Sequence, residues 1–153
     1  MNGRALLTHM AKYQARIASE ALLGRAARIE SDGALSPRVI FTDPEVAAVG
    51  HTLASALEAG IDAHAVDVET SANAGASFRG RNAPGTCRLV VDRSRTVIVG
   101  ATFTGFETAE SLHAATIAVV AEVPLERLRH AVPAYPTRSE IWLKLLEQLE
   151  PGA

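Results

Sequence analysis

Apolar residues recur with two different periods along this chain, and the change of period separates helices from strands. Residues 6–23 place apolar side chains at helical spacing, with Thr8 in the position of an N-cap and Gly24 in that of a C-cap. Residues 25–37 mix charge with Ser, Gly and Pro without any period, which indicates a linker. We therefore expect a helix, a linker and a domain that begins near Arg38.

The remainder of the chain shows strands first and helices mostly afterwards. β-rich stretches predict strands at 38–42, 46–49, 61–69, 86–92 and 96–104. The last two are separated by a short turn, which predicts an antiparallel hairpin. Helical stretches are expected at 52–59, 107–122, 124–130 and 141–149. This order predicts an α+β fold in which helices pack on one face of an antiparallel sheet.

The C-terminal helix has one apolar face, formed by Ile141, Trp142, Leu145, Leu146 and Leu149. We expect a homodimer in which a second copy of the chain covers this face. The helix that begins at Glu107 is expected to take part in the same dimer contact. Two T-x-x-E patterns, Thr104–Glu107 and Thr137–Glu140, predict capping boxes at the starts of these two helices.

The segment ahead of the C-terminal helix contains two prolines. Pro133 and Pro136 fix their own φ angles and move the preceding residues away from helical geometry. We therefore expect an extended, stiff backbone around Tyr135.

Composition excludes several classes of function. The 153 residues are 48% hydrophobic and 21% charged, which suits one globular domain. A net charge of -2 provides no basic surface for nucleic acid. No apolar run is long enough for a membrane helix and no signal-peptide core is present, so a cytoplasmic protein is expected. The single Cys87 excludes an intrachain disulfide, and the five histidines show no metal-ligand spacing.

Residues 70–85 form a glycine-rich stretch around Arg79 and Arg81. A basic loop of this kind either binds an anion or is simply solvated. The dinucleotide fingerprint G-x-G-x-x-G is absent and no strand leads directly into the loop, which favours the solvated loop.

Three motifs together resemble one enzyme family. The segment A-Y-P-T-R-S-E at 134–140 resembles the H-P-T-x-x-E segment near the C-terminus of the pyridine nucleotide-disulfide oxidoreductases, which are homodimeric flavoenzymes. The stretch V-I-F-T-D-P-E-V-A-A-V-G at 39–50 is similar to the entry to the family's dimerisation domain. G-F-E-T-A-E-S-L-H at 105–113 is similar to its G-x-E-x-x-E-x-x-H helix start. The resemblance implies a dimerisation domain over 38–153, preceded over 1–37 by the last helix of an FAD domain and a linker.

The resemblance also implies cofactors and site residues. A parent enzyme would bind FAD and NAD(P), whereas this fragment is expected to bind neither and to be inactive alone. The L-T-x-x-A match places Thr8, His9 and Met10 at a helix N-terminus aimed at the flavin, where the helix dipole would stabilise negative charge. In the family a His before Pro-Thr acts as acid and base and is oriented by a Glu five positions later.

In this chain those two positions hold Tyr135 and Glu140. Tyrosine has an ordinary pKa near 10 and is a poor base at neutral pH, so chemistry on a dithiol is not expected. Mercuric reductases resemble the chain in carrying Tyr there, but they also carry a C-terminal cysteine pair that this sequence lacks. Tyr135 is then either an interface aromatic or a group that faces substrate, and Glu140 either a cap or an orienting carboxylate.

Two functions remain open at this point. The first is the dimerisation domain of an FAD- and NAD(P)-dependent oxidoreductase, which supplies the homodimer interface and one wall of the partner's active site. The alternative is a free-standing dimeric interaction module without redox chemistry. The helix at 6–23 favours the first, because a free module has no use for it.

Overall fold

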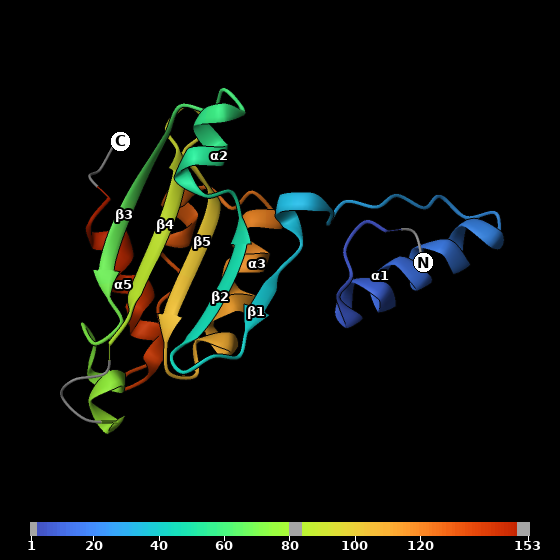
Figure 1. Ribbon diagram of the computed structural model, residues 1–153. Coiled ribbons are helices and arrows are strands. Elements are labelled where there is room, and N and C mark those ends of the chain that lie inside the picture. The colour runs from blue at the N-terminus through green and yellow to red at the C-terminus, as the bar shows by residue number, and fades with distance from the viewer. Residues whose placement is uncertain (1–2, 80–83, 150–153) are drawn as a thin grey trace.

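The computed structural model describes residues 3–79 and 84–149. A five-stranded antiparallel sheet with the order β1-β2-β5-β4-β3 forms the centre of the molecule (Figure 1). Its strands are β1 (Arg38–Ile40), β2 (Glu45–Gly50), β3 (Ala63–Glu69), β4 (Thr86–Asp92) and β5 (Val97–Gly105). The expected fold class is therefore confirmed, including the β4–β5 hairpin.

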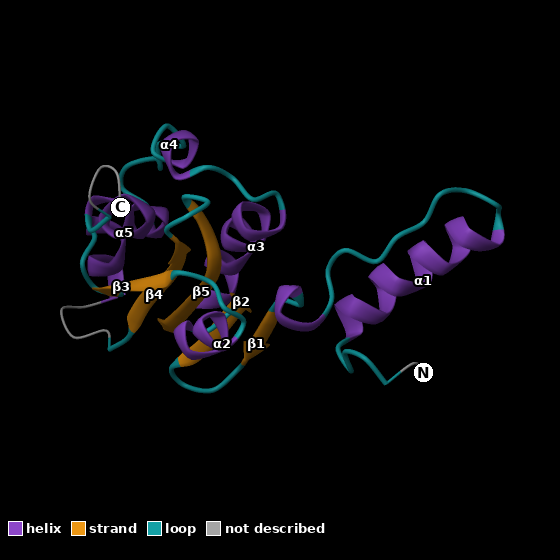
Figure 2. Cartoon of the chain, turned by 90° about the horizontal axis from the view of Figure 1, so that it is seen from above, coloured by secondary structure: helices purple, strands orange, loops and turns teal. Residues whose placement is uncertain are grey.

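Helices cover the sheet on both faces, although unequally. The α-helices are α1 (Thr8–Leu22), α2 (Leu53–Glu58), α3 (Leu112–Val120), α4 (Leu125–Leu128) and α5 (Ile141–Glu147). Four short 3-10 helices are η1 (Gly33–Leu35), η2 (Ala74–Arg79), η3 (Thr108–Ser111) and η4 (Arg138–Glu140). Viewed from above, α3 and α5 lie on one face and the small α2 on the other, while α1 stands apart from the body (Figure 2).

Alternation along the central strands produces two separate cores. On β4, Leu89 and Val91 point to the face that α3 and α5 cover, whereas Val90 points to the face beneath α2. The register shifts between Val90 and Val91, where the pairing with β5 is irregular. Because successive strand residues face opposite sides, a strand buried on both faces is apolar at nearly every position. This explains the continuous apolar runs in β4 and β5.

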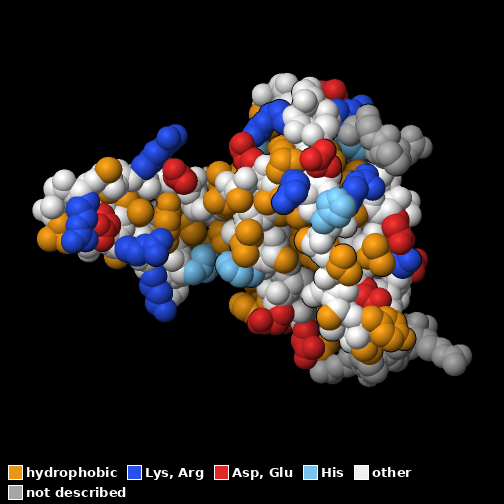
Figure 3. All heavy atoms as spheres, turned by 180° about the vertical axis from the view of Figure 1, so that it is seen from behind, with side chains coloured by type: hydrophobic (Ala, Val, Ile, Leu, Met, Phe, Trp, Pro, Cys, Tyr) orange, Lys and Arg blue, Asp and Glu red, His pale blue; other side chains and the backbone are white. Residues whose placement is uncertain are grey.

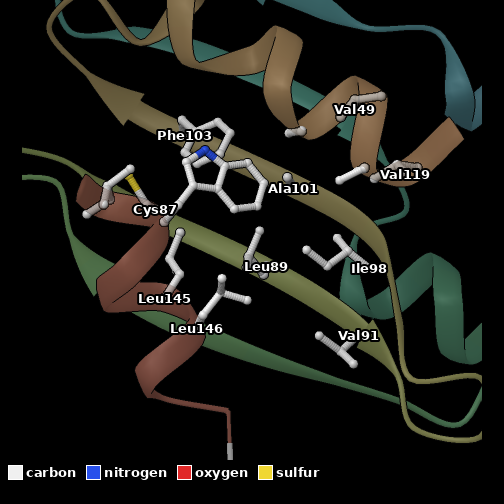
Figure 4. Packing of buried hydrophobic residues seen from close by; sticks show 14 of the residues in the cluster. Val49, Cys87, Leu89, Val91, Ile98, Ala101, Phe103, Val119, Leu145 and Leu146 are labelled. Carbon is white, nitrogen blue, oxygen red and sulfur yellow. The ribbon is translucent and has the colours of Figure 1, made fainter. Parts of the chain in front are cut away.

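The apolar face of α5 packs against the sheet of its own chain. Leu145 is fully buried, and Leu146 projects toward Leu89 on β4 (Figure 4). Trp142 meets Phe103 of β5 with ring centroids 6.1 Å apart and an interplanar angle of 59°, a tilted aromatic contact. The expectation that a second copy covers this face is therefore wrong. A helix period shows that a face is buried, but it does not show what buries it.

Three expected helix caps are also wrong. The Thr104 hydroxyl bonds the backbone of Thr86 on the neighbouring strand, and Glu107 has a left-handed backbone with φ of 53°. The hydroxyl of Thr137 donates to the carbonyl of Ala134 at 2.6 Å instead of capping α5. At α1 the N-cap residue is Leu7, without a side-chain cap, so Thr8 is the first helical residue. Tertiary hydrogen bonds compete with local capping for the same hydroxyls.

A complete capping box occurs at α2, where the sequence has no T-x-x-E pattern. Thr52 accepts from the Ser55 backbone N–H at 3.1 Å, and the Ser55 hydroxyl accepts from the Thr52 N–H at 3.0 Å. Serine thus takes the role that Glu or Gln plays in the pattern T-x-x-E.

The segment after α1 folds back along this helix instead of forming a free linker. The Tyr13 hydroxyl accepts hydrogen bonds from the backbone N–H groups of Glu30 and Ser31. The imidazole Nε2 of His9 lies 2.7 Å from the carbonyl oxygen of Pro37, just before β1. Gly24 has φ of 70° directly after the helix C-cap, as expected for a terminating glycine.

Leu145 and Leu143 allow a direct test of which face of α5 is buried. Leu145→Ala should lower the free energy of unfolding by about 2–5 kcal/mol, because it leaves a cavity in the core. Leu143 is 45% exposed on the same helix, so Leu143→Ala should cost less than about 1 kcal/mol. Urea denaturation measures both values, and equal losses would contradict this orientation of α5.

Candidate functional site

The three family-like motifs meet at one end of the sheet, the lower end in Figure 1. The Asp-Pro-Glu turn of the first leads into β2, the second begins at the last residue of β5, and the third lies ahead of α5. Glu45 of the first motif accepts a hydrogen bond from the backbone N–H of Ala109 in the second, at 3.1 Å. Arg138 of the third contacts Phe106 and Glu107 of the second. Residues that are distant in sequence thus form one structural unit.

The Asp-Pro-Glu turn fixes the start of β2. The hydroxyl of Thr42 donates to the carbonyl of Pro44 at 2.7 Å, across the cis peptide bond between Asp43 and Pro44. Glu45 is then paired with Gly105, the last residue of β5, in the sheet register. This pairing brings the carboxylate of Glu45 to the 3-10 helix η3. There it accepts a hydrogen bond from the N–H of Ala109, which has no partner within the helix.

Arg138 joins the Tyr135 segment to the loop after β5. Its guanidinium carbon lies 5.9 Å from the centroid of the Phe106 ring, within cation–π range. Its Nη1 lies 3.8 Å from Oε2 of Glu107. An ion pair as exposed as this one contributes little free energy, so its main effect is on geometry.

A fourth loop supports the same end of the sheet. Thr70 is buried, and its hydroxyl donates to the carbonyl of Thr104 at 2.6 Å. Asn73 donates to the carbonyl of Thr70 and accepts from the N–H of Ala76. The stretch expected to be an irregular, solvated loop is therefore anchored, and it contains η2. The anion site suggested for Arg79 and Arg81 rests on side chains outside the described residues.

Tyr135 projects from the rim of this unit. Its side chain is 78% exposed, and the neighbouring Val132 is also strongly exposed. The peptide bond between Tyr135 and Pro136 is cis, and neither residue belongs to a helix or strand.

Glu140 is the last residue of η4. Its Oε2 is buried and has no hydrogen-bond partner within the part of the chain that the structure describes. A buried carboxylate oxygen normally has such a partner, so this oxygen is unusual among buried polar atoms.

Cys87 lies inside this end of the sheet, and its thiol is free and buried. Burial raises the pKa of its thiol, and this outweighs the opposing effects of the hydrogen bond with Thr70 and of the Arg138 charge. Among the described residues no three His, Cys, Asp or Glu side chains gather as metal ligands would.

The residues expected at the flavin lie elsewhere. Thr8 and His9 are exposed at the start of α1, whereas the Met10 side chain is buried. Helices α1 and α5 lie on opposite sides of the body in both ribbon views (Figures 1 and 2). A single chain therefore does not bring these residues to Tyr135.

The helical layer carries an apolar surface that the sequence analysis missed. A groove of about 320 Å³ lies between α3, α4 and α5, lined by side chains that include Ile117, Leu128 and Leu146. Around it, Ile117, Val120 and Leu143 are exposed. The space-filling view of this side shows hydrophobic side chains spread over the body (Figure 3). The signal was present in residues 112–120, where only His113 and Thr116 are polar, because a helix that is apolar on most of its surface needs a second apolar surface to pack against.

A family model described as "Pyridine nucleotide-disulphide oxidoreductase, dimerisation domain" matches residues 36–146. The chain belongs to this family. It is 30% identical over 141 residues to a dihydrolipoyl dehydrogenase of Bacillus subtilis and 31% identical over 141 residues to that of Geobacillus stearothermophilus. Each match covers 92% of this chain and 29% of the relative. The chain thus spans less than a third of these relatives' length.

Solved structures share the fold. LpdA from Mycobacterium tuberculosis superposes with a TM-score of 0.86 at 24% identity, over 97% of this chain and 32% of the other. The HOCl-induced flavoprotein disulfide reductase RclA from Escherichia coli superposes with a TM-score of 0.83 at 23% identity, over 95% of this chain and 33% of the other. The family model, which covers residues 36–146, confirms the family expected from the three motifs. Among the described residues, no helix has the length and apolar character that a bilayer crossing requires.

The buried thiol gives a test of the site's interior. A raised pKa means that the folded state holds the thiol proton more tightly than the unfolded state, so Cys87 favours folding at neutral pH. This contribution disappears as the pH rises from the ordinary thiol pKa to the raised one. The thiol reagent DTNB should accordingly react slowly with the folded protein and rapidly in denaturant. Cys87→Ala gives the background rate of DTNB consumption. Equal reaction rates for the folded and the denatured protein would contradict the burial of the Cys87 thiol.

Proposed function

We propose that this domain belongs to an FAD- and NAD(P)-dependent oxidoreductase, in which it forms the homodimer interface and supplies one wall of the partner subunit's active site. The observation that carries the proposal is the exposed apolar surface of the helical layer, beside the three-motif unit that presents Tyr135. The structural neighbours support the cofactors, since they include a flavoprotein disulfide reductase and an NAD-dependent persulfide reductase.

The dimer contact is assigned to the outer side of the helical layer. Ile117 and Val120 lie three residues apart on α3, so they share one face of that helix, and Leu143 is exposed on α5. The groove between the helices offers a recess beside these side chains. A two-fold axis pairs one patch with an identical patch, so the same surface serves both subunits. A stable dimer of this kind buries about 800 Å² on each partner.

Tyr135 is assigned to the partner's active site. The phenol is exposed on a segment whose neighbours hold it from two sides, which suits a group that reaches beyond its own subunit. Tyrosine does not accept a thiol proton near pH 7, but its hydroxyl donates a hydrogen bond and its ring stacks on planar groups. The unpartnered Oε2 of Glu140 fits a site in which the histidine that such a carboxylate would orient is replaced. The electron acceptor is then one from which no proton has to be removed.

Helix α1 is assigned to the FAD domain of the parent chain. Leu6, Leu22 and Leu23 are strongly exposed on or beside it, although leucines of this kind are normally covered. The N-terminus at Thr8, His9 and Met10 would point toward the flavin, where the positive end of the helix dipole stabilises the reduced, anionic form. The same exposed leucines argue against a free-standing dimeric module, which would leave them uncovered.

A charge at the centre of the proposed dimer contact should separate the subunits. Ile117→Asp should convert dimer to monomer in sedimentation velocity while circular dichroism stays unchanged, because Ile117 is 54% exposed and is not needed for the core. Leu57→Asp is the matched control, since Leu57 is also 54% exposed but lies on α2, on the other face of the sheet. If the dimer persists in Ile117→Asp, the interface does not include this face of α3.

The parent enzyme tests the role of Tyr135. With dihydrolipoamide or glutathione disulfide as substrate, we expect low rates for the wild type and a higher rate for Tyr135→His. A positioned acid–base group contributes about 10² to 10⁴-fold, and a phenol supplies little of this as a base near neutral pH. Tyr135→Phe, which keeps the ring and removes the hydroxyl, separates stacking from hydrogen bonding. Wild-type rates equal to those of histidine-bearing relatives would refute the assignment.

A further inference from the structure

Gly75 lies against the backbone of the Tyr135 segment. A methyl group in place of its hydrogen would lie 2.5 Å from both the carbonyl oxygen of Thr137 and the backbone nitrogen of Arg138, and closer still to the Thr137 carbonyl carbon. These are backbone atoms, so no change of rotamer relieves the overlap. The φ angle of Gly75 is outside the left-handed region, and it is therefore the neighbour, not backbone strain, that excludes a side chain.

The loop that carries Gly75 cannot simply withdraw. Thr70 anchors it to the carbonyl of Thr104 on β5, and Asn73 closes the turn through Thr70 and Ala76. Gly75 and Ala76 are both buried, in contact with η4. The anchored loop is thus a fixed surface on which the Tyr135 segment rests.

The opposing segment is buried only toward its C-terminal end. From Ile141 onward α5 is buried in the core, whereas Ala134, Tyr135 and Pro136 are exposed. To restore ordinary contact at 3.4 Å, an added methyl would have to displace the Thr137 backbone by about 1 Å. The exposed part moves most easily, and it carries the tyrosine.

We infer that Gly75 is a positioning residue that sets where Tyr135 lies at the rim of the domain. The inference rests on the proposed function, because it concerns the tyrosine assigned to the partner's active site. It goes beyond that function by placing the control of this side chain in a loop some sixty residues earlier in the sequence. A displacement of about 1 Å is enough to reduce the effectiveness of a group that must meet a reacting partner.

Fluorine NMR on the 153-residue chain tests the inference without any enzyme activity. The chain has two tyrosines, so labelling with 3-fluorotyrosine gives two signals, which Tyr13→Phe assigns. Tyr13 lies on α1, away from the site, and serves as an internal reference. We expect Gly75→Ala to shift the Tyr135 signal and leave the Tyr13 signal in place. Ala72→Ser, an exposed change in the same loop, should shift neither.

A second variant keeps the inference testable if Gly75→Ala does not fold. Thr70→Val retains shape but loses the hydrogen bond to Thr104, so the loop loosens and the Tyr135 signal should again shift, whereas Thr70→Ser keeps the hydroxyl and should not. An unmoved Tyr135 signal in folded Gly75→Ala, or in Thr70→Val, overturns the inference. Because the signal is read on the isolated chain, this result is independent of the enzyme assays, and either proposal can fail alone.

Discussion

The packing of α5 on the sheet is the interaction on which the other features depend. Trp142, Leu145 and Leu146 enter the same core as Phe103 and Leu89, and this fixes the helix over β3 and β4, with Trp142 reaching Phe103 of β5. Fixing the helix also fixes the segment before it, so Tyr135 comes to the rim beside the loops after β3 and β5. It also leaves Leu143 exposed. One buried face therefore determines both the position of the candidate site and the composition of the surface available to a second subunit.

The residues that identify the family act here mainly through structure. Glu45 accepts a hydrogen bond from the backbone N–H of Ala109, and Gly50 lies so close to β5 that a β-carbon there would meet backbone atoms. Within the three motifs, only Tyr135 and Glu140 occupy positions to which the resemblance gives a chemical role. The family is thus recognised mainly through residues that shape the sheet, while the chemistry that the resemblance implies rests on two positions, one of which has changed. Identity of fold therefore says little about the identity of the electron acceptor.

Much of the fold could be predicted from the sequence because alternation and turn residues are local signals. The bounds of β4 follow directly from the run between Thr86 and Asp92. The failures occurred where a side chain had two possible partners. Thr104 and Thr137 carry the right spacing for a cap, but their hydroxyls bond Thr86 and Ala134 instead. In the candidate site, the motifs predicted Tyr135 and Glu140, but the unpartnered oxygen of Glu140 and the close approach of Gly75 depend on tertiary contacts that no spacing encodes.

Helix α3 has apolar residues on both of its sides, with Leu112, Ala115 and Val119 toward the sheet and Ile117 and Val120 away from it. Folding of one chain therefore leaves Ile117 and Val120 exposed. In the proposed dimer this apolar surface would be buried on association, and any process that favours association would also favour the folded state. The thermal stability of the domain would then depend on its concentration, and dilution would act as a mild denaturant. In a cell, the abundance of the protein would then help to set the lifetime of each folded copy.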